Sequence, residues 1–408
     1  MSSTPLTSRL FVLITGWLLL ATLARGLCDI HEWAISMWFV SYDIGFIKRG
    51  LPGTILAQVN SVLGDAGLLP DLISIVAVIN LILLALALLA ITSRSHQKCG
   101  QLWLLMLLAA IVSSPAITMM ANLIGYYDHI ITLLTITAIT LVVRQHFGAA
   151  GLVAAMAVFV HETALTNMLP VLVFSLALTA WQHGWSRRQT AAQLSLLIIP
   201  TLSAFVWTFL QQGDTQQQTQ RIDQLVQLFT ANMPINIERA SYYAQMLTYP
   251  FMDYLHEQAP KFIERITDPV YTTSVLPILA AGLTGMVMAL RRQKCHLIVV
   301  IMAILVVVAP LSLHLIAFDT ERIWVMPIVL LLLVGWVMAE HNLLVGAHNM
   351  PLLTTVCLLL VVYHCSLRPF GMMPADIQLW PSDLFQIYLL PILGLVWLQR
   401  PTATPPAP

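Results

Sequence analysis

The chain has 408 residues, of which 58% are hydrophobic and only 9% are charged. Soluble domains carry about 25% charged residues, so this composition excludes an ordinary water-soluble fold. The 19 basic and 19 acidic residues balance, which excludes nucleic-acid binding driven by bulk positive charge.

Long apolar runs recur along the chain, each close to the roughly 20 residues that an α-helix needs to cross a bilayer. They predict an all-α, polytopic transmembrane helix bundle of about twelve spans, with residues 1–400 forming one integral membrane domain and 401–408 a disordered cytoplasmic tail. Residues 148–181 fit either two short spans with a turn near 161–163 or one long broken helix. The candidate spans are about 10–27, 71–92, 102–120, 129–143, 148–161, 164–181, 190–210, 273–290, 296–315, 323–339, 351–365 and 385–398.

Basic residues indicate the sidedness, because short cytoplasmic loops are enriched in Lys and Arg. With a cytoplasmic N-terminus, Glu340 is the only acid among the short cytoplasmic connections, which contain Arg9, Arg94, Lys98, Arg144, Arg187, Arg188, Arg291, Arg292, Lys294 and Arg400. We therefore predict a bacterial inner-membrane protein with both termini in the cytoplasm. Its external loops are about 28–70, 211–272 and 366–384, and we expect function on that side, where the chain has more residues than spanning requires.

The first external loop contains SYDIGFIKRGLPG, residues 41–53, after an aromatic segment at 33–39 that predicts a helix in the headgroup region. Lys48 and Arg49 lie at an external membrane edge, where cations are normally disfavoured. They either reach lipid phosphates or pair with Asp43, or they bind a substrate phosphate. The nearby glycines favour the phosphate site slightly, because they permit turns and close approach to a ligand. Pro52 predicts a non-helical Leu51.

Two further charged clusters map to the same edge. In GYYDHI, residues 125–130, Asp128 and His129 begin a predicted helix. Asp128 there either caps the helix beside an aromatic belt, or it binds a metal or takes a proton. In VFVHETALTN, residues 158–167, His161 and Glu162 follow a strongly apolar run. A charge at the bilayer centre costs roughly 2.5–3.5 kcal/mol, and less at the edge, so this pair predicts a buried partner or a water-filled cavity.

A fourth cluster, HLIAFDTERIW at 314–324, places Asp319 and Arg322 in a short external turn. These charges either solubilise the turn or recognise an anionic headgroup or sugar phosphate. Because four clusters from separate segments reach one membrane edge, we predict a cavity there that is lined by acids, histidines and arginine. Four independent helix ends in water are the alternative.

Over about residues 1–210 the layout resembles that of integral-membrane glycosyltransferases of the GT-C type, although no motif of that family is matched letter by letter. The shared features are a first helix, a long external loop with interfacial helices and an acid, and many following spans. The first loop lacks the adjacent DD or DE pair of that family. The resemblance implies a lipid-phosphate-linked sugar donor and a role for Asp29, Glu32 or Asp43 as general base or metal ligand. YDIGFIKRG also resembles stretches in bacterial membrane proteins of unknown function.

These observations predict a glycosyltransferase of envelope glycan assembly that uses a polyprenyl-phosphate- or diphosphate-linked sugar at the periplasmic face. The other expected partners are membrane lipids, with no nucleic acid, and a divalent metal ion is one candidate cofactor. The candidate catalytic residues are Asp43, Asp128 and Glu162, and the candidate substrate-binding residues are Lys48, Arg49, His129, His161, Asp319 and Arg322.

Two other functions stay open. The first is an O-antigen or exopolysaccharide polymerase or ligase, in which external Arg and His residues hold polyprenyl diphosphate; the candidates are Arg239, Arg265, Arg322 and His161. The second is a multi-pass transporter. It ranks last, because such proteins carry ionisable residues at mid-membrane and internal repeats, and the sequence shows neither.

Overall fold

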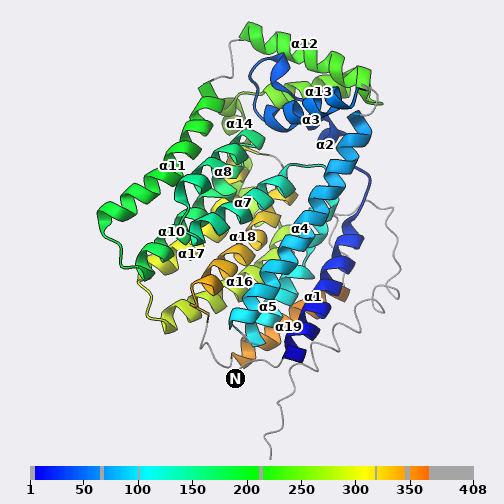
Figure 1. Cartoon of the computed structure of the whole chain (residues 1–408). Helices are drawn as coiled ribbons and strands as arrows, with labels where there is room; N and C mark the ends of the chain where they lie inside the picture. The colour runs from blue at the N-terminus through cyan, green and yellow to red at the C-terminus, as the bar shows by residue number, and fades with distance from the viewer. Residues whose placement is uncertain are drawn as a thin grey trace, which may run out of the picture.

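The computed structural model describes residues 5–64, 69–99, 102–210, 215–317, 319–344 and 350–366. All regular structure in these ranges is helical (Figure 1). Three shorter apolar helices, Asp128–Val143, Phe147–Val160 and Pro351–His364, accompany eight stretches that are long and apolar enough to cross a membrane. The eight are Arg9–Gly26, Leu69–Cys99, Trp103–Asn122, Ala164–Gln182, Arg187–Thr208, Thr272–Arg292, Leu297–Leu315 and Thr320–Glu340. The predicted span at 385–398, the tail and nearly all of the predicted loop at 366–384 lie outside the described residues.

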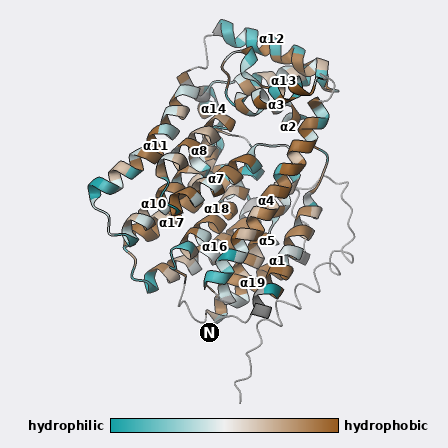
Figure 2. Cartoon of the chain, viewed as in Figure 1, coloured by the Kyte–Doolittle hydropathy of each residue, from teal (hydrophilic) through white to brown (hydrophobic). Residues whose placement is uncertain are grey.

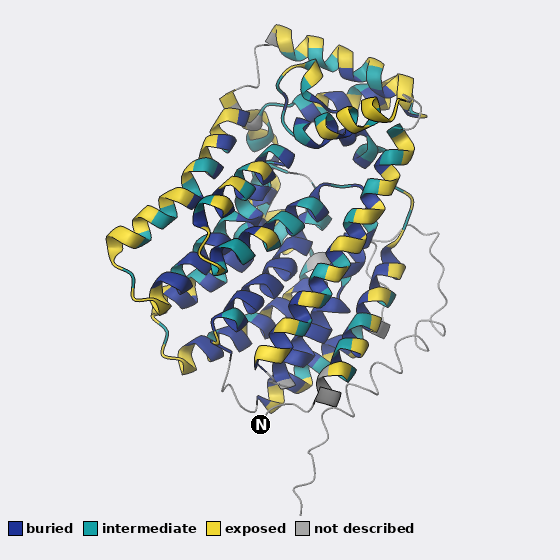
Figure 3. Ribbon diagram, viewed as in Figure 1, coloured by how far each residue is buried: buried dark blue, intermediate teal, exposed yellow. Residues whose placement is uncertain are grey.

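The main bundle has a buried centre and an apolar outer surface. Its centre is formed by α5, α6 and α18, whose side chains are almost all buried, whereas α4 and α11 expose large apolar side chains (Figure 3). Such exposure suits a lipid environment. The bundle elements are α1 (Pro5–Gly26), α4 (Leu69–Cys99), α5 (Leu102–Val112), α6 (Pro115–Asn122), α7 (Asp128–Val143), α8 (Phe147–Val160), α9 (Ala164–Asn167), α10 (Leu169–Gln182), α11 (Arg187–Leu210), α16 (Pro269–Arg292), α17 (Leu297–Val308), the 3₁₀ helix η4 (Ala309–Leu315), α18 (Thr320–Glu340) and α19 (Pro351–Ser366).

A layer of shorter helices lies at one end of this bundle (Figure 1). We call it the cap layer. Its largest member, α12, is mostly hydrophilic, in contrast to the bundle helices (Figure 2). The layer consists of α2 (Glu32–Trp38), η1 (Tyr42–Ile44), α3 (Gly50–Leu63), α12 (Thr215–Asn232), α13 (Ile237–Thr248), α14 (Phe251–Gln258), η3 (Ala259–Lys261) and α15 (Phe262–Thr267).

Residues 148–181 form a helical hairpin. The chain leaves α8 at His161, turns, and returns through α9 and α10. Gln145 before α8 contacts His183 after α10, with 3.1 Å between their Nε2 atoms, so α8 and α10 run in opposite directions. The two-segment interpretation therefore holds, and the turn carries His161 and Glu162 toward the cap layer.

The aromatic segment of the first loop forms a helix, but its large side chains point inward. Trp38 is buried and donates its indole N–H to the Gly125 carbonyl at 2.7 Å. Tyr127 is fully buried, and its hydroxyl donates to the Met37 carbonyl at 2.7 Å. Packing of α2 on the residues just before α7 thus accounts for aromatic residues that the sequence attributed to a headgroup position and an aromatic belt.

The prediction of a non-helical Leu51 is wrong, because α3 begins at Gly50. Pro52 lies in the first turn, where a backbone N–H has no acceptor within the helix, so its missing N–H costs little there.

Candidate functional site

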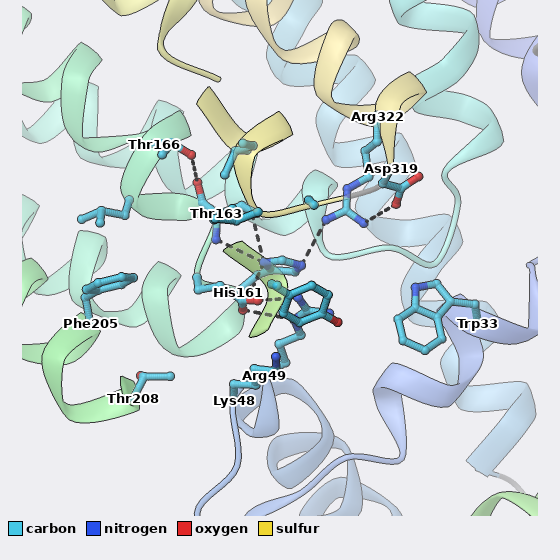
Figure 4. A pocket seen from close by; sticks show the side chains of 16 residues that line it. Trp33, Lys48, Arg49, His161, Thr163, Thr166, Phe205, Thr208, Asp319 and Arg322 are labelled. Carbon is cyan, nitrogen blue, oxygen red and sulfur yellow. Dashed lines mark hydrogen bonds and ion pairs between the residues drawn. The ribbon is translucent and has the colours of Figure 1, made fainter. Parts of the chain in front are cut away.

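A cavity of about 240 Å³ lies where the cap layer meets the bundle. Side chains from α2, α9, α11, α14, η4 and α18 line it, together with the residues before α3 and the turn after α8 (Figure 4). Six residues predicted from three of the four sequence clusters line this one cavity: Lys48, Arg49, His161, Glu162, Asp319 and Arg322. The structure thus brings three of the predicted clusters to one cavity, and Asp128 of the fourth contacts Arg322.

Arg49 is held in a conformation that non-glycine residues rarely adopt. Its φ is 66°, in the left-handed region, directly before α3. The following turn is fixed by close packing, because a Cβ on Gly53 would lie 2.0 Å from the Val40 carbonyl oxygen. The Arg49 side chain lines the cavity.

Glu162 is the partner of Arg49. The Arg49 Nε donates to Oε2 of Glu162 at 3.0 Å, and Nη2 contacts the other carboxylate oxygen, which makes the pair bidentate. Burial alone would raise the pKa of Glu162, but Arg49 and Lys48 together hold it well below its usual range. Glu162 is therefore ionised, and its side chain remains 23% exposed.

His161 joins this ion pair to Arg322. Burial and the nearby Arg49 keep the pKa of His161 well below its ordinary value, so the ring is neutral. Its Nε2 lies 3.1 Å from Nη2 of Arg322, which can only donate, so Nε2 accepts. Its Nδ1 faces the Thr163 backbone N–H at 3.2 Å, the Thr163 hydroxyl at 3.0 Å and Oε2 of Glu162 at 3.3 Å.

Arg322 lies between two carboxylates. Its Nε is 3.2 Å from Oδ2 of Asp128, and its Nη1 donates to Asp319 at 3.1 Å. Asp128 begins α7 as predicted, and its side chain is 2% exposed. Asp319 is 34% exposed and lines the cavity, so it is the accessible carboxylate of this group.

Lys48 belongs to no ion pair among the described residues. Its ammonium donates to the Tyr249 carbonyl at 2.9 Å and lies 4.9 Å from the centre of the Tyr254 ring. Burial is the main cause that lowers the pKa of Lys48, to about 8. Lys48 is thus still predominantly charged at neutral pH, without a carboxylate of its own.

Three of the predicted catalytic and binding residues lie outside the cavity lining: Asp43, Asp128 and His129. Asp43 is exposed and accepts a hydrogen bond from the Ser41 hydroxyl at 3.1 Å, so it is not the partner of Lys48 or Arg49. His129 is buried, with its Nε2 2.6 Å from the Met120 carbonyl oxygen. Glu32, another acid of the first loop, forms a surface ion pair with Arg239 of α13 at 2.9 Å.

Sequence reasoning missed several lining residues. Thr163 and Thr166 lie within VFVHETALTN, so their closeness to His161 and Glu162 in the sequence could have identified them as lining residues. Phe205 faces the cavity from α11, whereas its neighbour Trp207 is exposed, and no local pattern separates the two. Tyr254 comes from a polar loop that carried no motif.

The charges divide into two groups. Lys48, Arg49 and Glu162 together carry one excess positive charge, and Arg322 with Asp128 and Asp319 carries one excess negative charge, with neutral His161 between them. The arrangement can bind an anion at one group and accept a proton at the other. The described residues contain no group of three or more His, Cys, Asp or Glu side chains that could hold a metal ion. No protein-family model, curated protein or solved structure matches the chain.

Proposed function

We propose that the chain is an inner-membrane glycosyltransferase of envelope glycan assembly that acts at the periplasmic face on a polyprenyl-phosphate-linked sugar. One observation carries the proposal: a single cavity combines an apolar wall, a positive group and an accessible carboxylate. A lipid-linked sugar phosphate requires these three chemistries, for its chain, its phosphate and the acceptor hydroxyl.

The donor phosphate binds at Lys48 and Arg49. Lys48 supplies a point charge, and Arg49 supplies a guanidinium that Glu162 holds in one orientation. Negative charge develops on the phosphate as the glycosidic bond breaks, and fixed cations stabilise that charge. Leu165, Phe205 and Ile316 provide the apolar lining for the first part of the prenyl chain.

Asp319 acts as the general base. Its carboxylate is more exposed than those of Asp128 and Glu162, and both Glu162 oxygens contact Arg49. The acceptor oxygen forms a bond to the anomeric carbon, and the bond from that carbon to the phosphate oxygen breaks. Its electron pair leaves with the lipid phosphate, and the acceptor proton passes to Asp319. Asp128 and Glu162 orient the two arginines, and exposed Asp43 takes no part.

The number of membrane spans and their orientation are part of the same proposal. The eight long and three shorter apolar helices make eleven spans, and 385–398 adds the twelfth. Glu340 lies at the opposite end of α18, about 27 Å from Arg322 at 1.5 Å per residue. The basic connections after α4, α7, α10 and α16 lie at that far end, which supports a periplasmic cavity, cytoplasmic termini and a cap layer at the external interface.

The polymerase or ligase alternative has less support. Arg239 is 63% exposed and pairs with Glu32. Arg265 donates to the Ala317 carbonyl and to the Gln258 side chain, each at 2.6 Å. Neither residue lines the cavity, so two of the four side chains expected to hold a diphosphate are engaged elsewhere. Transport also ranks lower, because the charges gather near one end of the bundle.

Complementation of a deletion strain tests the proposal. Loss of the gene should alter an envelope glycan, and wild-type protein should restore it. Arg49→Lys, Glu162→Gln and Asp319→Asn should fail at matched membrane expression, whereas Arg94→Lys, in the ion pair with Glu340 at the far end, should succeed. Complementation by all three cavity variants, or an unchanged glycan profile in the deletion strain, would refute the proposal.

A further inference from the structure

The cavity has two chemically different ends. Phe205 and Thr208 come from α11, whose neighbouring Val206 and Trp207 are about half exposed on its apolar outer face. Trp33 comes from α2 in the cap layer. Figure 4 shows Trp33 across the cavity from Phe205 and Thr208, with His161 and Arg49 between them. The α11 end therefore adjoins the lipid-facing surface, and the Trp33 end lies within the cap layer.

The Trp33 end has polar surroundings and a fixed aromatic ring. The indole of Trp33 packs on Tyr243 in an edge-on contact with 5.1 Å between ring centres. The preceding residue in the chain, Glu32, pairs with the exposed Arg239, and Tyr242 is 49% exposed. A half-buried, oriented indole beside an aqueous rim is a suitable surface for a ligand that has both an apolar face and hydroxyl groups.

We propose that Trp33 is the platform for the acceptor and that the acceptor is a carbohydrate. One face of a pyranose ring presents C–H groups, which stack on an indole, while its hydroxyls reach the carboxylate of Asp319. This inference rests on the proposed function, because it assigns the second substrate of the same cavity. The donor lipid enters from the α11 end, so donor and acceptor approach the charged centre from opposite sides.

Binding to the full-length protein in detergent tests this assignment. The probes are polyprenyl phosphate and a panel of methyl glycosides of neutral hexoses and N-acetylhexosamines, with sorbitol at equal concentration to correct for general stabilisation by polyols. Thermal melting is followed for wild type, Trp33→Phe, Trp33→Leu and the control Trp207→Leu, which replaces an exposed Trp of α11.

At least one glycoside should raise the melting temperature of the wild type beyond the sorbitol effect. Trp33→Leu should weaken the apparent affinity for that glycoside roughly tenfold or more, because a flat ring face is lost, whereas Trp33→Phe and Trp207→Leu should weaken it much less. All four proteins should respond alike to polyprenyl phosphate.

Other outcomes separate the two proposals. If polyprenyl phosphate stabilises the wild type and no glycoside does, the carbohydrate acceptor is wrong and the lipid-phosphate site stands. An unchanged glycoside response in Trp33→Leu overturns the role of Trp33. No response of the wild type to polyprenyl phosphate counts against the proposed function itself.

Discussion

Each charged side chain of the cavity except Lys48 belongs to an ion pair, and two of these pairs join distant parts of the chain. Arg49 before α3 binds Glu162 after α8, and Arg322 of α18 binds Asp128 of α7. An ion pair removed from water is stabilising only while both members are present, because loss of one leaves an uncompensated charge. These ion pairs therefore also fix the position of the first loop relative to the bundle, and of α18 relative to α7.

We expect strong coupling between Arg49 and Glu162 in a double-mutant cycle with alanine. Their side chains are 12% and 23% exposed, so the coupling free energy should be about 2–4 kcal/mol, slightly below that of a fully buried pair. Chemical or thermal unfolding in detergent measures it. The matched cycle on Arg239 and Glu32, which are 63% and 33% exposed, should give less than about 1 kcal/mol. Equal coupling in the two cycles would contradict the burial argument.

His161 should make stability sensitive to acid. Its pKa is depressed in the folded protein, so below its ordinary pKa of 6.5 the unfolded chain takes up a proton that the folded chain does not. Stability from the neutral ring is therefore complete above that value and decreases as the pH falls, by about 1.4 kcal/mol per pH unit. Melting curves between about pH 7 and pH 5 should fall more steeply for wild type than for His161→Gln. Parallel pH profiles would show that His161 titrates normally.

At the scale of elements, α8 positions the site because it packs closely on α11. A Cβ on Gly151 would lie 2.2 Å from the Leu196 carbonyl oxygen, so only glycine permits this approach of the two backbones. The same contact sets the distance between His161, which follows α8, and Phe205 on α11.

Gly151→Ala should lower stability by about 1–3 kcal/mol, because α11 must move away from α8. Gly148→Ala, one turn earlier on the same helix, meets no atom within 4 Å and should be neutral or stabilising by up to about 1 kcal/mol. Melting temperatures of the two purified variants provide the comparison. A Gly148→Ala variant as unstable as Gly151→Ala would mean that helix packing is not the cause.

At the scale of the whole molecule, the proposal places the cap layer outside the cell and the basic connections inside. Gln220→Cys in α12 and Gln293→Cys after α16, both exposed, report on the two sides. In a background with Cys28 and Cys295 replaced by alanine, an impermeant maleimide should label position 220 in intact cells. Position 293 should be labelled only after permeabilisation. The reverse pattern would invert the orientation.

Hydropathy predicted the bundle well because a bilayer-spanning helix needs a long apolar run, which is a local property. Most described bundle helices match predicted spans within a few residues, including the start of α7 at Asp128. The same reasoning predicted a partner for Glu162, since a charge so near an apolar core requires one. Identifying Arg49 as that partner required the arrangement of α3 against α8, which no local pattern encodes.

The sequence was less informative about side-chain direction. Asp43 lies five residues before Lys48, yet it faces solvent, because the turn at 42–45 points it away from the cavity. Trp38 looked like an interfacial residue and is buried, whereas Trp33 of the same helix reaches the cavity. Orientation around a short helix depends on what the helix packs against.

The central claim is that Lys48 and Arg49 form a site for the phosphate of a prenyl lipid. The most direct test titrates polyprenyl phosphate and the matching polyprenol against wild type, Lys48→Met and Lys98→Met, with Lys98 serving as the lysine control at the far end of the bundle. We predict that the phosphate form binds wild type and Lys98→Met alike, that Lys48→Met binds it roughly tenfold or more weakly, and that polyprenol binds all three equally weakly. Equal affinity of Lys48→Met and wild type for polyprenyl phosphate, or equal affinity of the wild type for the two lipids, would contradict the account.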